Sequence, residues 1–200
     1  MSKIIDTKQS KTIKMRTIIF IISLLTSFSV QAQTFTLKSN ELGGQATEKQ
    51  VFNGFGCNGK NLSPQLFWEN PPKDTKSFAV TIFDENAPTG SGWWHWLIFD
   101  IALTIKELKS GAGNLSLNLA PLGSIQSMTD FNTQGYGGPC PPEGHGFHRY
   151  VVTVYALKTN KLGLNANTSP ALVGFMLEQN VIEKASLIFF ACWSVLELQY

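Results

Sequence analysis

The sequence predicts a mostly β protein, and three observations support this prediction. Short runs rich in β-branched and aromatic residues follow the first thirty positions, and Gly, Pro or Asn interrupts them about every ten residues. Several of these runs alternate so that apolar residues fall on one face. A length of 200 residues with 43% hydrophobic content suits one domain with a sizeable core.

The first two expected strands are Ser77–Asp84 (SFAVTIFD) and His95–Ile101 (HWLIFDI). In the first, the even-numbered positions form an apolar stripe that ends in the carboxylate of Asp84. In the second, simple alternation places His95 on one face with Leu97 and Phe99. Both strands therefore carry a polar group beside a loop.

The third expected strand is Arg149–Leu157 (RYVVTVYAL), and extending it back by one residue places His148 and Tyr150 on one face and Arg149 on the other. We expect Arg149 to pair with a carboxylate. A fourth run, Ser186–Trp193 (SLIFFACW), is apolar on both faces, as in a buried or terminal strand.

One helix is expected between the last two strands. Ser169 followed by Pro170 supplies an N-cap and a proline in the first turn. Helical spacing then connects a set of mainly apolar residues, and the helix ends before Ser186: Leu172, Phe175, Met176 and Gln179.

Residues 1–32 are typical of a signal peptide. Basic residues precede the apolar run from Ile18 to Val30, and the run closes on Val30-Gln31-Ala32, a small-residue cleavage pattern. A membrane-spanning helix needs about 20 apolar residues, and this run is shorter. We therefore expect no stable membrane span, a mature domain of residues 33–200, and a periplasmic or secreted location.

The charge of the expected mature domain excludes two classes of partner. The leader holds five basic residues and one acidic residue, so its removal changes the formal charge from +2 to −2. No basic stripe or charge run remains after residue 32. This argues against nucleic acid or a polybasic contact with a membrane surface.

Three polar clusters stand at strand ends or in adjacent loops. They are Asp84–Pro88, Gly92–Trp96, and the run 137–142 (GGPCPP) that leads into His148-Arg149-Tyr150. A protonated imidazole donates from both ring nitrogens, and a neighbouring carboxylate such as Asp84 favours that form. Tyr150 adds a hydroxyl donor, and the Gly-rich run lets backbone amides approach a ligand. The clusters together suit an anion pocket, with Trp93, Trp94 and Trp96 as apolar wall.

These motifs, in this order, resemble the phosphatidylethanolamine-binding protein family, especially its bacterial Raf-kinase-inhibitor-like branch. The resemblance covers 35–192 and also includes Cys57-Asn58-Gly59 and Asn61–Pro64. It implies a large central antiparallel sheet, a smaller second sheet and few helices. It also implies a pocket for phosphate-like groups, formed by the following residues: Asp84, His95, Gly138, Cys140, Pro141, His148 and Tyr150.

The chain departs from the family motif after Asp84. The family usually has two aspartates separated by a proline, whereas Glu85 and Asn86 replace the proline and the second aspartate here. If that second carboxylate is structural, Asn86 can still bridge a turn; if it tunes the pocket, affinity differs.

Two covalent features are also expected. Of the three cysteines, Cys57 and Cys140 lie in two loops typical of the family, which implies a disulfide between them, with Cys192 as a packed free thiol. A tight turn after Asp84 predicts a cis bond between Ala87 and Pro88, because only X-Pro bonds adopt cis at low cost.

The sequence therefore predicts a non-enzymatic binding protein for a small anion, phosphate or phosphoethanolamine-like, with no cofactor. A kinase or protease as protein target stays open. A hydrolase is one alternative, although no GxSxG or HExxH motif occurs. A zinc site formed by His95, His145 and His148 is another, and the odd spacing of the last two weighs against it on a strand.

Overall fold

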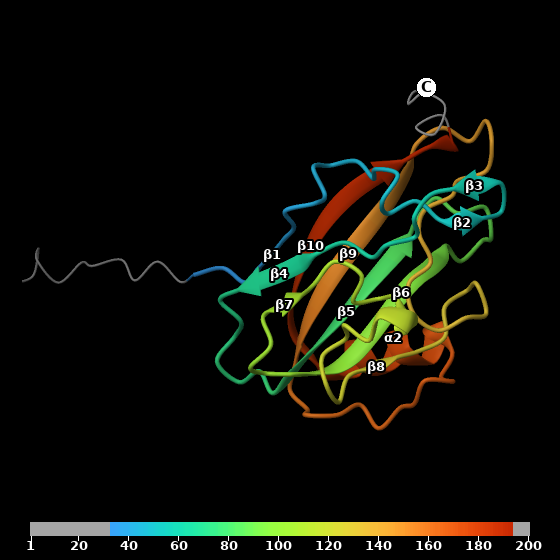
Figure 1. Ribbon diagram of the computed structural model, residues 1–200. Coiled ribbons are helices and arrows are strands. Elements are labelled where there is room, and N and C mark those ends of the chain that lie inside the picture. The colour runs from blue at the N-terminus through green and yellow to red at the C-terminus, as the bar shows by residue number, and fades with distance from the viewer. Residues whose placement is uncertain (1–32, 194–200) are drawn as a thin grey trace, which may run out of the picture. The chain divides into compact units, whose positions relative to one another are not determined.

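A computed structural model describes residues 33–193, and it confirms the mostly β prediction (Figure 1). The main element is a five-stranded antiparallel sheet in the order β10-β9-β5-β6-β8. Its strands have the following bounds: β5 Ser77–Asp84, β6 Trp93–Ala102, β8 Ile125–Gln126, β9 His148–Leu157 and β10 Val181–Ala191.

The remaining strands form two small sheets, whereas the family resemblance implies one smaller second sheet. Strands β1 (Thr36–Lys38), β4 (Leu66–Glu69) and β7 (Glu107–Leu108) pair in the order β1-β4-β7. Strands β2 (Asn53–Gly54) and β3 (Cys57–Asn58) form a two-residue hairpin.

The core has two parts, one on each face of the central sheet. Residues from β5, β6 and β9 pack against the β1-β4-β7 sheet on one face, with Trp68 and Phe78 among the fully buried side chains. On the other face, Leu97 and Phe99 pack with α2 (Pro170–Asn180). Burial of these apolar side chains is the main term that favours the folded chain.

The predicted helix exists, but its buried side chains are different. Helix α2 buries Val173 and Leu177, whereas Leu172 and Phe175 are exposed. Ser169 precedes the helix without a side-chain capping hydrogen bond. The helix meets the sheet along one narrow face, so the choice between adjacent apolar positions depends on how α2 is oriented against β6 and β9.

Strand β10 is a terminal strand and begins earlier than predicted, at Val181. It pairs with β9 along its length, and beyond that only a bridge between Gln45 and Phe190 reaches its other edge in the described chain. Ile188 and Phe190, which point to the same face of this strand, are partly exposed. Within residues 33–193, no helix is long and apolar enough to cross a membrane.

Candidate anion-binding site

A β-bulge in β6 decides which face of the sheet carries His95. Ile82 pairs with Trp96 and Phe83 pairs with Trp94, so His95 is the extra residue between two registered pairs. A bulge of this kind re-aims a side chain. His95 therefore shares the face of Trp96, and the prediction that it lies with Leu97 and Phe99 is wrong.

The bulge brings His95 to a small cavity at the ends of β5, β6 and β9. The cavity has a volume of about 210 Å³, below the roughly 300–1,000 Å³ typical of sites for drug-sized ligands. Its lining includes six of the seven predicted site residues: Asp84, His95, Cys140, Pro141, His148 and Tyr150. The seventh, Gly138, lies behind the lining, where a Cβ atom would stand 2.0 Å from the backbone oxygen of Gln50.

Asp84 and His148 form a buried pair at the base of this pocket. The His148 Nδ1 lies 2.7 Å from the Asp84 Oδ2, and both side chains are almost fully buried. Because a carboxylate accepts, Nδ1 donates and Nε2 is the nitrogen that can meet a ligand. Asp84 thus orients His148.

His95 has a different partner and a different electrostatic state. Its Nδ1 donates to the backbone oxygen of Gly137 at 2.7 Å, which again leaves Nε2 for a ligand. Burial lowers the pKa of His95 to about 4, and the nearby carboxylate of Asp84 offsets only part of that effect. Asp84 therefore does not keep His95 charged at neutral pH.

Tyr150 places a neutral hydroxyl in the same site, and this hydroxyl donates a hydrogen bond to the carboxylate of Asp84. Burial and the negative charge of Asp84 both raise its pKa, so the phenol stays protonated. Its ring packs edge-on to His95, with centroids 5.1 Å apart, and stacks on Phe189 at 5.0 Å. These contacts fix the tyrosine between the pocket and the core.

The disulfide between Cys57 and Cys140 is present, which confirms that prediction. It joins the β2–β3 hairpin to the loop that forms one rim of the pocket. The same loop is held by Phe52, whose backbone N–H donates to the oxygen of Pro139, and by Asn61, whose side chain accepts from the N–H of Gly138. Cys192 is buried and takes no part in this disulfide.

The prediction of a cis bond before Pro88 is wrong, because residues 33–193 contain no cis peptide bond. The Asp84 side chain closes the turn instead by accepting from the N–H of Asn86 at 2.8 Å. Asn86 in turn accepts from the N–H of Arg149, so this amide bridges the ends of β5 and β9. Arg149 pairs with Glu85 outside the pocket, as predicted for a structural arginine.

The apolar wall combines one predicted residue with others that the sequence did not indicate. Trp93 lines the pocket, whereas Trp94 packs toward α2 and Trp96 belongs to the core. Phe55 and Phe131 complete the wall, with ring centroids 5.7 Å apart. Phe55 is 71% exposed at a Gly-Phe-Gly hairpin tip, and this aromatic residue two positions before Cys57 was a usable signal.

The three histidines do not form one cluster with other ligands. The rings of His145 and His148 lie 5.7 Å apart, but Asp84 occupies the Nδ1 of His148. In the part of the chain that the structure describes, no group of three His, Cys, Asp or Glu residues is placed to hold a metal ion.

A β domain with a large central sheet, two small sheets and a small, aromatic-walled pocket has the architecture of a binding protein. The comparisons identify the family: residues 43–191 match the family model of phosphatidylethanolamine-binding proteins. The chain therefore belongs to the phosphatidylethanolamine-binding protein family.

Individual relatives agree with this assignment. The chain is 48% identical to the protein YbcL of Escherichia coli K12 over 80% of its own length and 89% of that relative. It is 42% identical to YbhB of the same organism, covering 76% and 96% of the two chains. The crystal structure of E. coli YbcL superposes with a TM-score of 0.77 at 46% identity, covering 79% of this chain and 98% of that one.

Proposed function

We propose that this chain is a non-enzymatic binding protein whose pocket takes a small phosphate-like anion, free or as a phospholipid head group. The observation that carries the proposal is the convergence of Asp84, His95, His148 and Tyr150 on one cavity of about 210 Å³. The volume suits a group of head-group size, and the apolar wall favours a substituent next to the anion.

The protonation state of His95 defines which anions fit. Neither Lys nor Arg is among the lining residues, so the pocket has no permanent positive charge of its own. Neutral His95 offers Nε2 as an acceptor. A phosphate group that carries its own proton satisfies that acceptor. A fully deprotonated phosphate requires His95 to take up a proton.

Several observations support binding rather than turnover. Asp84 is engaged with His148 and the N–H of Asn86, and the lining includes no serine or free cysteine beside a base. A hydrolase acting on a small ester or phosphate is the alternative, and its test is turnover that His95→Ala abolishes. Inhibition of a kinase or protease is a further option within the binding class.

We also propose that residues 1–32, which lie outside the described residues, are a signal peptide and that 33–200 is the mature, periplasmic or secreted domain. A disulfide between Cys57 and Cys140 persists in oxidising compartments. A relative that is 30% identical is named a lipoprotein, LppC of Mycobacterium tuberculosis. N-terminal sequencing of exported protein should begin near Gln33; an intact residue 20 would contradict the cleavage.

Calorimetry of the oxidised mature domain against inorganic phosphate, phosphoethanolamine and head-group lipids tests the binding function. We expect His95→Ala to weaken binding about tenfold to a hundredfold, as for a charge-assisted hydrogen bond of roughly 1.5–3 kcal/mol. His145→Ala is the matched control, because His145 is exposed and outside the lining. Equal binding by wild type and His95→Ala would refute the assignment.

The pH dependence supplies a second readout. Affinity for phosphate should fall as pH rises above neutrality, because the bound state contains one more proton on His95 or on the ligand than the free components do. Calorimetry in buffers of different ionisation enthalpy should therefore detect net proton uptake. An affinity that stays constant from pH 6 to pH 9 would contradict this arrangement.

A further inference from the structure

The aromatic wall of the anion pocket leads from the buried histidines to the protein surface. The ring of Phe131 packs edge-on to His95, with centroids 5.2 Å apart. The same ring lies 5.7 Å from that of Phe55, which is 71% exposed between β2 and β3. All three residues line the cavity, together with Trp93. A substituent on an anion held at His95 therefore leaves the pocket along aromatic rings.

Phe55 is held in place although much of its ring is open to solvent. The ring contacts those of Phe52 at 5.5 Å and Phe131 at 5.7 Å. The disulfide between Cys57 and Cys140 fixes the same hairpin to the rim loop. A side chain that is already ordered loses little conformational freedom when a ligand docks on it. The exposed part of Phe55 is thus a preformed contact surface at the mouth of the pocket.

The lining offers a ligand no net positive charge at neutral pH. Asp84 is the one carboxylate among its described residues, no Lys or Arg is present, and His95 is neutral because burial lowers its pKa to about 4. The net charge of the lining is therefore zero when His148 is protonated and −1 when it is not. An anion that carries its own cation adds no uncompensated charge to such a site.

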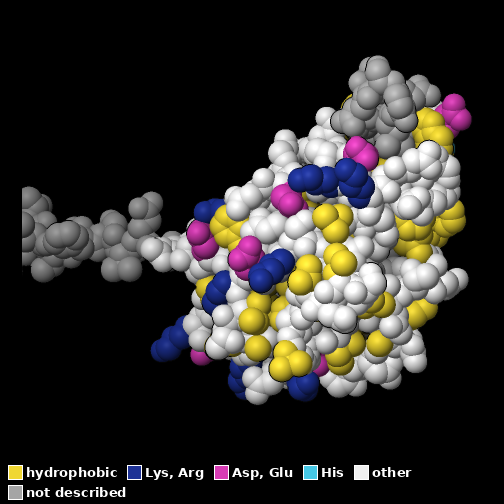
Figure 2. Space-filling view, in the orientation of Figure 1, with side chains coloured by type: hydrophobic (Ala, Val, Ile, Leu, Met, Phe, Trp, Pro, Cys, Tyr) yellow, Lys and Arg dark blue, Asp and Glu magenta, His cyan; other side chains and the backbone are white. Residues whose placement is uncertain are grey.

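The surface around the β2–β3 hairpin provides no strong charge either. Figure 2 shows mainly uncharged surface beside β2 and β3, whereas charged side chains of both signs lie over the small β1-β4-β7 sheet. The contact that the pocket mouth offers to a cation is therefore the aromatic wall itself.

This wall discriminates between kinds of cation. A quaternary ammonium has no N–H group and is attracted to the negative face of an aromatic ring. A primary ammonium has three N–H donors, which need oxygen acceptors once water is displaced. Phe55, Phe131 and Trp93 present π surface and no side-chain oxygen. The wall consequently favours the methylated cation over the primary one.

We propose that the pocket selects a phosphate ester whose substituent ends in a quaternary ammonium, with Phe55 as the specificity-determining residue. The inference rests on the proposed function, because the phosphate occupies the anion site beside His95 and His148. The ammonium stands against the ring of Phe55, and the linker passes Phe131. This is the chemistry of choline phosphate, either as a free ester or as a lipid head group.

Calorimetry of the oxidised mature domain tests the selection with three methyl diesters, each of which carries a single phosphate charge at neutral pH. They are the diesters of choline phosphate, of ethanolamine phosphate and of dimethylbutyl phosphate, in which a carbon atom replaces the quaternary nitrogen. We expect the choline diester to bind about two- to fivefold more tightly than its neutral analogue, as for a cation–π contact at an exposed ring. It should also bind more tightly than the ethanolamine diester. Inorganic phosphate is the reference for the anion site.

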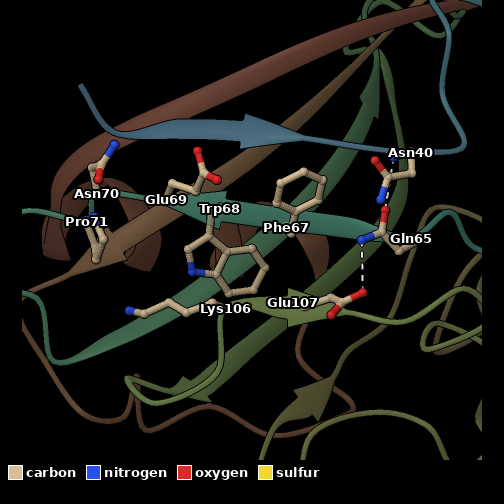
Figure 3. A pocket seen from close by; sticks show the side chains of 9 residues that line it. All are labelled: Asn40, Gln65, Phe67, Trp68, Glu69, Asn70, Pro71, Lys106 and Glu107. Atoms are coloured by element: carbon tan, nitrogen blue, oxygen red, sulfur yellow. Dashed lines mark hydrogen bonds between the residues drawn. The ribbon is translucent and has the colours of Figure 1, made fainter. Parts of the chain in front are cut away.

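Two variants assign the preference to one ring. Phe55→Leu keeps an apolar side chain but removes the aromatic face, so it should abolish the preference for the choline diester over the neutral analogue. Phe67→Leu is the matched control and should keep the wild-type preference. Phe67 is a partly exposed ring in a groove on the β1-β4-β7 sheet that shares no lining residue with the pocket (Figure 3).

Vesicles distinguish the two sources of the ligand. Sedimentation of the protein with phosphatidylcholine vesicles, reduced in Phe55→Leu, would assign the lipid head group. Binding of the soluble choline diester without such sedimentation would assign a free ester. Either result supports the ammonium site.

The proposal is overturned if the neutral analogue or the ethanolamine diester binds as tightly as the choline diester, or if Phe55→Leu retains the wild-type preference. Binding of inorganic phosphate without a preference among the diesters refutes this inference alone and leaves the anion pocket intact. Absence of binding by phosphate and by all three diesters refutes the proposed function as well.

Discussion

Replacing His95 by Asn should remove a specific acid sensitivity of the fold. His95 is buried and its pKa is lowered to about 4, whereas the unfolded chain has the ordinary value of 6.5. The unfolded state therefore binds more protons between these values, and stability falls as pH falls through this window. The contribution of His95 is fully present above pH 6.5 and is lost toward pH 4.

The magnitude follows from the two pKa values. Between pH 7 and pH 4.5, the linkage relation gives a loss of about 2.4 kcal/mol from His95 alone. Asn at this position keeps an amide donor near the place of Nδ1, so it can still serve the backbone oxygen of Gly137. It does not titrate, and the variant should lack this part of the pH dependence.

Urea denaturation of both proteins at pH 7 and pH 4.5 measures the effect. The readout is the pH-induced change in the free energy of unfolding of the wild type minus that of the variant. The contributions of the carboxylates and the other histidines are similar in both proteins and largely cancel in this difference. Asn fills less space than imidazole, so the variant is expected to be less stable at pH 7, but this offset does not enter the comparison. Equal pH dependence of wild type and variant would refute a neutral, buried His95.

Three other substitutions give separate tests. The double variant Cys57→Ser with Cys140→Ser should lose about 2–5 kcal/mol of stability, because the disulfide closes a loop with a sequence separation of 83; an unchanged urea midpoint would contradict this. Gly138→Ala should cost about 1–3 kcal/mol through overpacking against a backbone oxygen, while Gly43→Ala, which meets nothing within 4 Å, should be near neutral by thermal melting. His148→Ala should cost about 3–5 kcal/mol, because it leaves a buried carboxylate unpaired; a loss below 1 kcal/mol in urea titration would argue against that pair.

The amino-acid pattern was sufficient where a residue's role follows from local periodicity. Alternation along β9 correctly placed His148 and Tyr150 on the pocket face and Arg149 outside it, since neighbouring side chains of a regular strand point to opposite faces. The motifs around Asp84 also carried the family resemblance, and with it the sheet architecture and the pairing of Cys57 with Cys140.

Contacts between segments decided what periodicity could not. The bulge at His95 arises from the register between β5 and β6, and one extra residue reverses the face that alternation predicts. In α2, helical spacing alone does not select the buried positions; packing of the helix on the sheet buries Val173 and Leu177.

Electrostatics and turn geometry also depend on the folded chain rather than on the sequence pattern alone. The sequence supplied a histidine near a carboxylate, but only the folded chain shows that Asp84 pairs with His148 and that burial outweighs its effect on His95. The turn before Pro88 needs no cis bond because the Asp84 side chain closes it. Residue types and strand parity are local properties of the chain, whereas register, burial and pKa depend on which distant segments pack around each group.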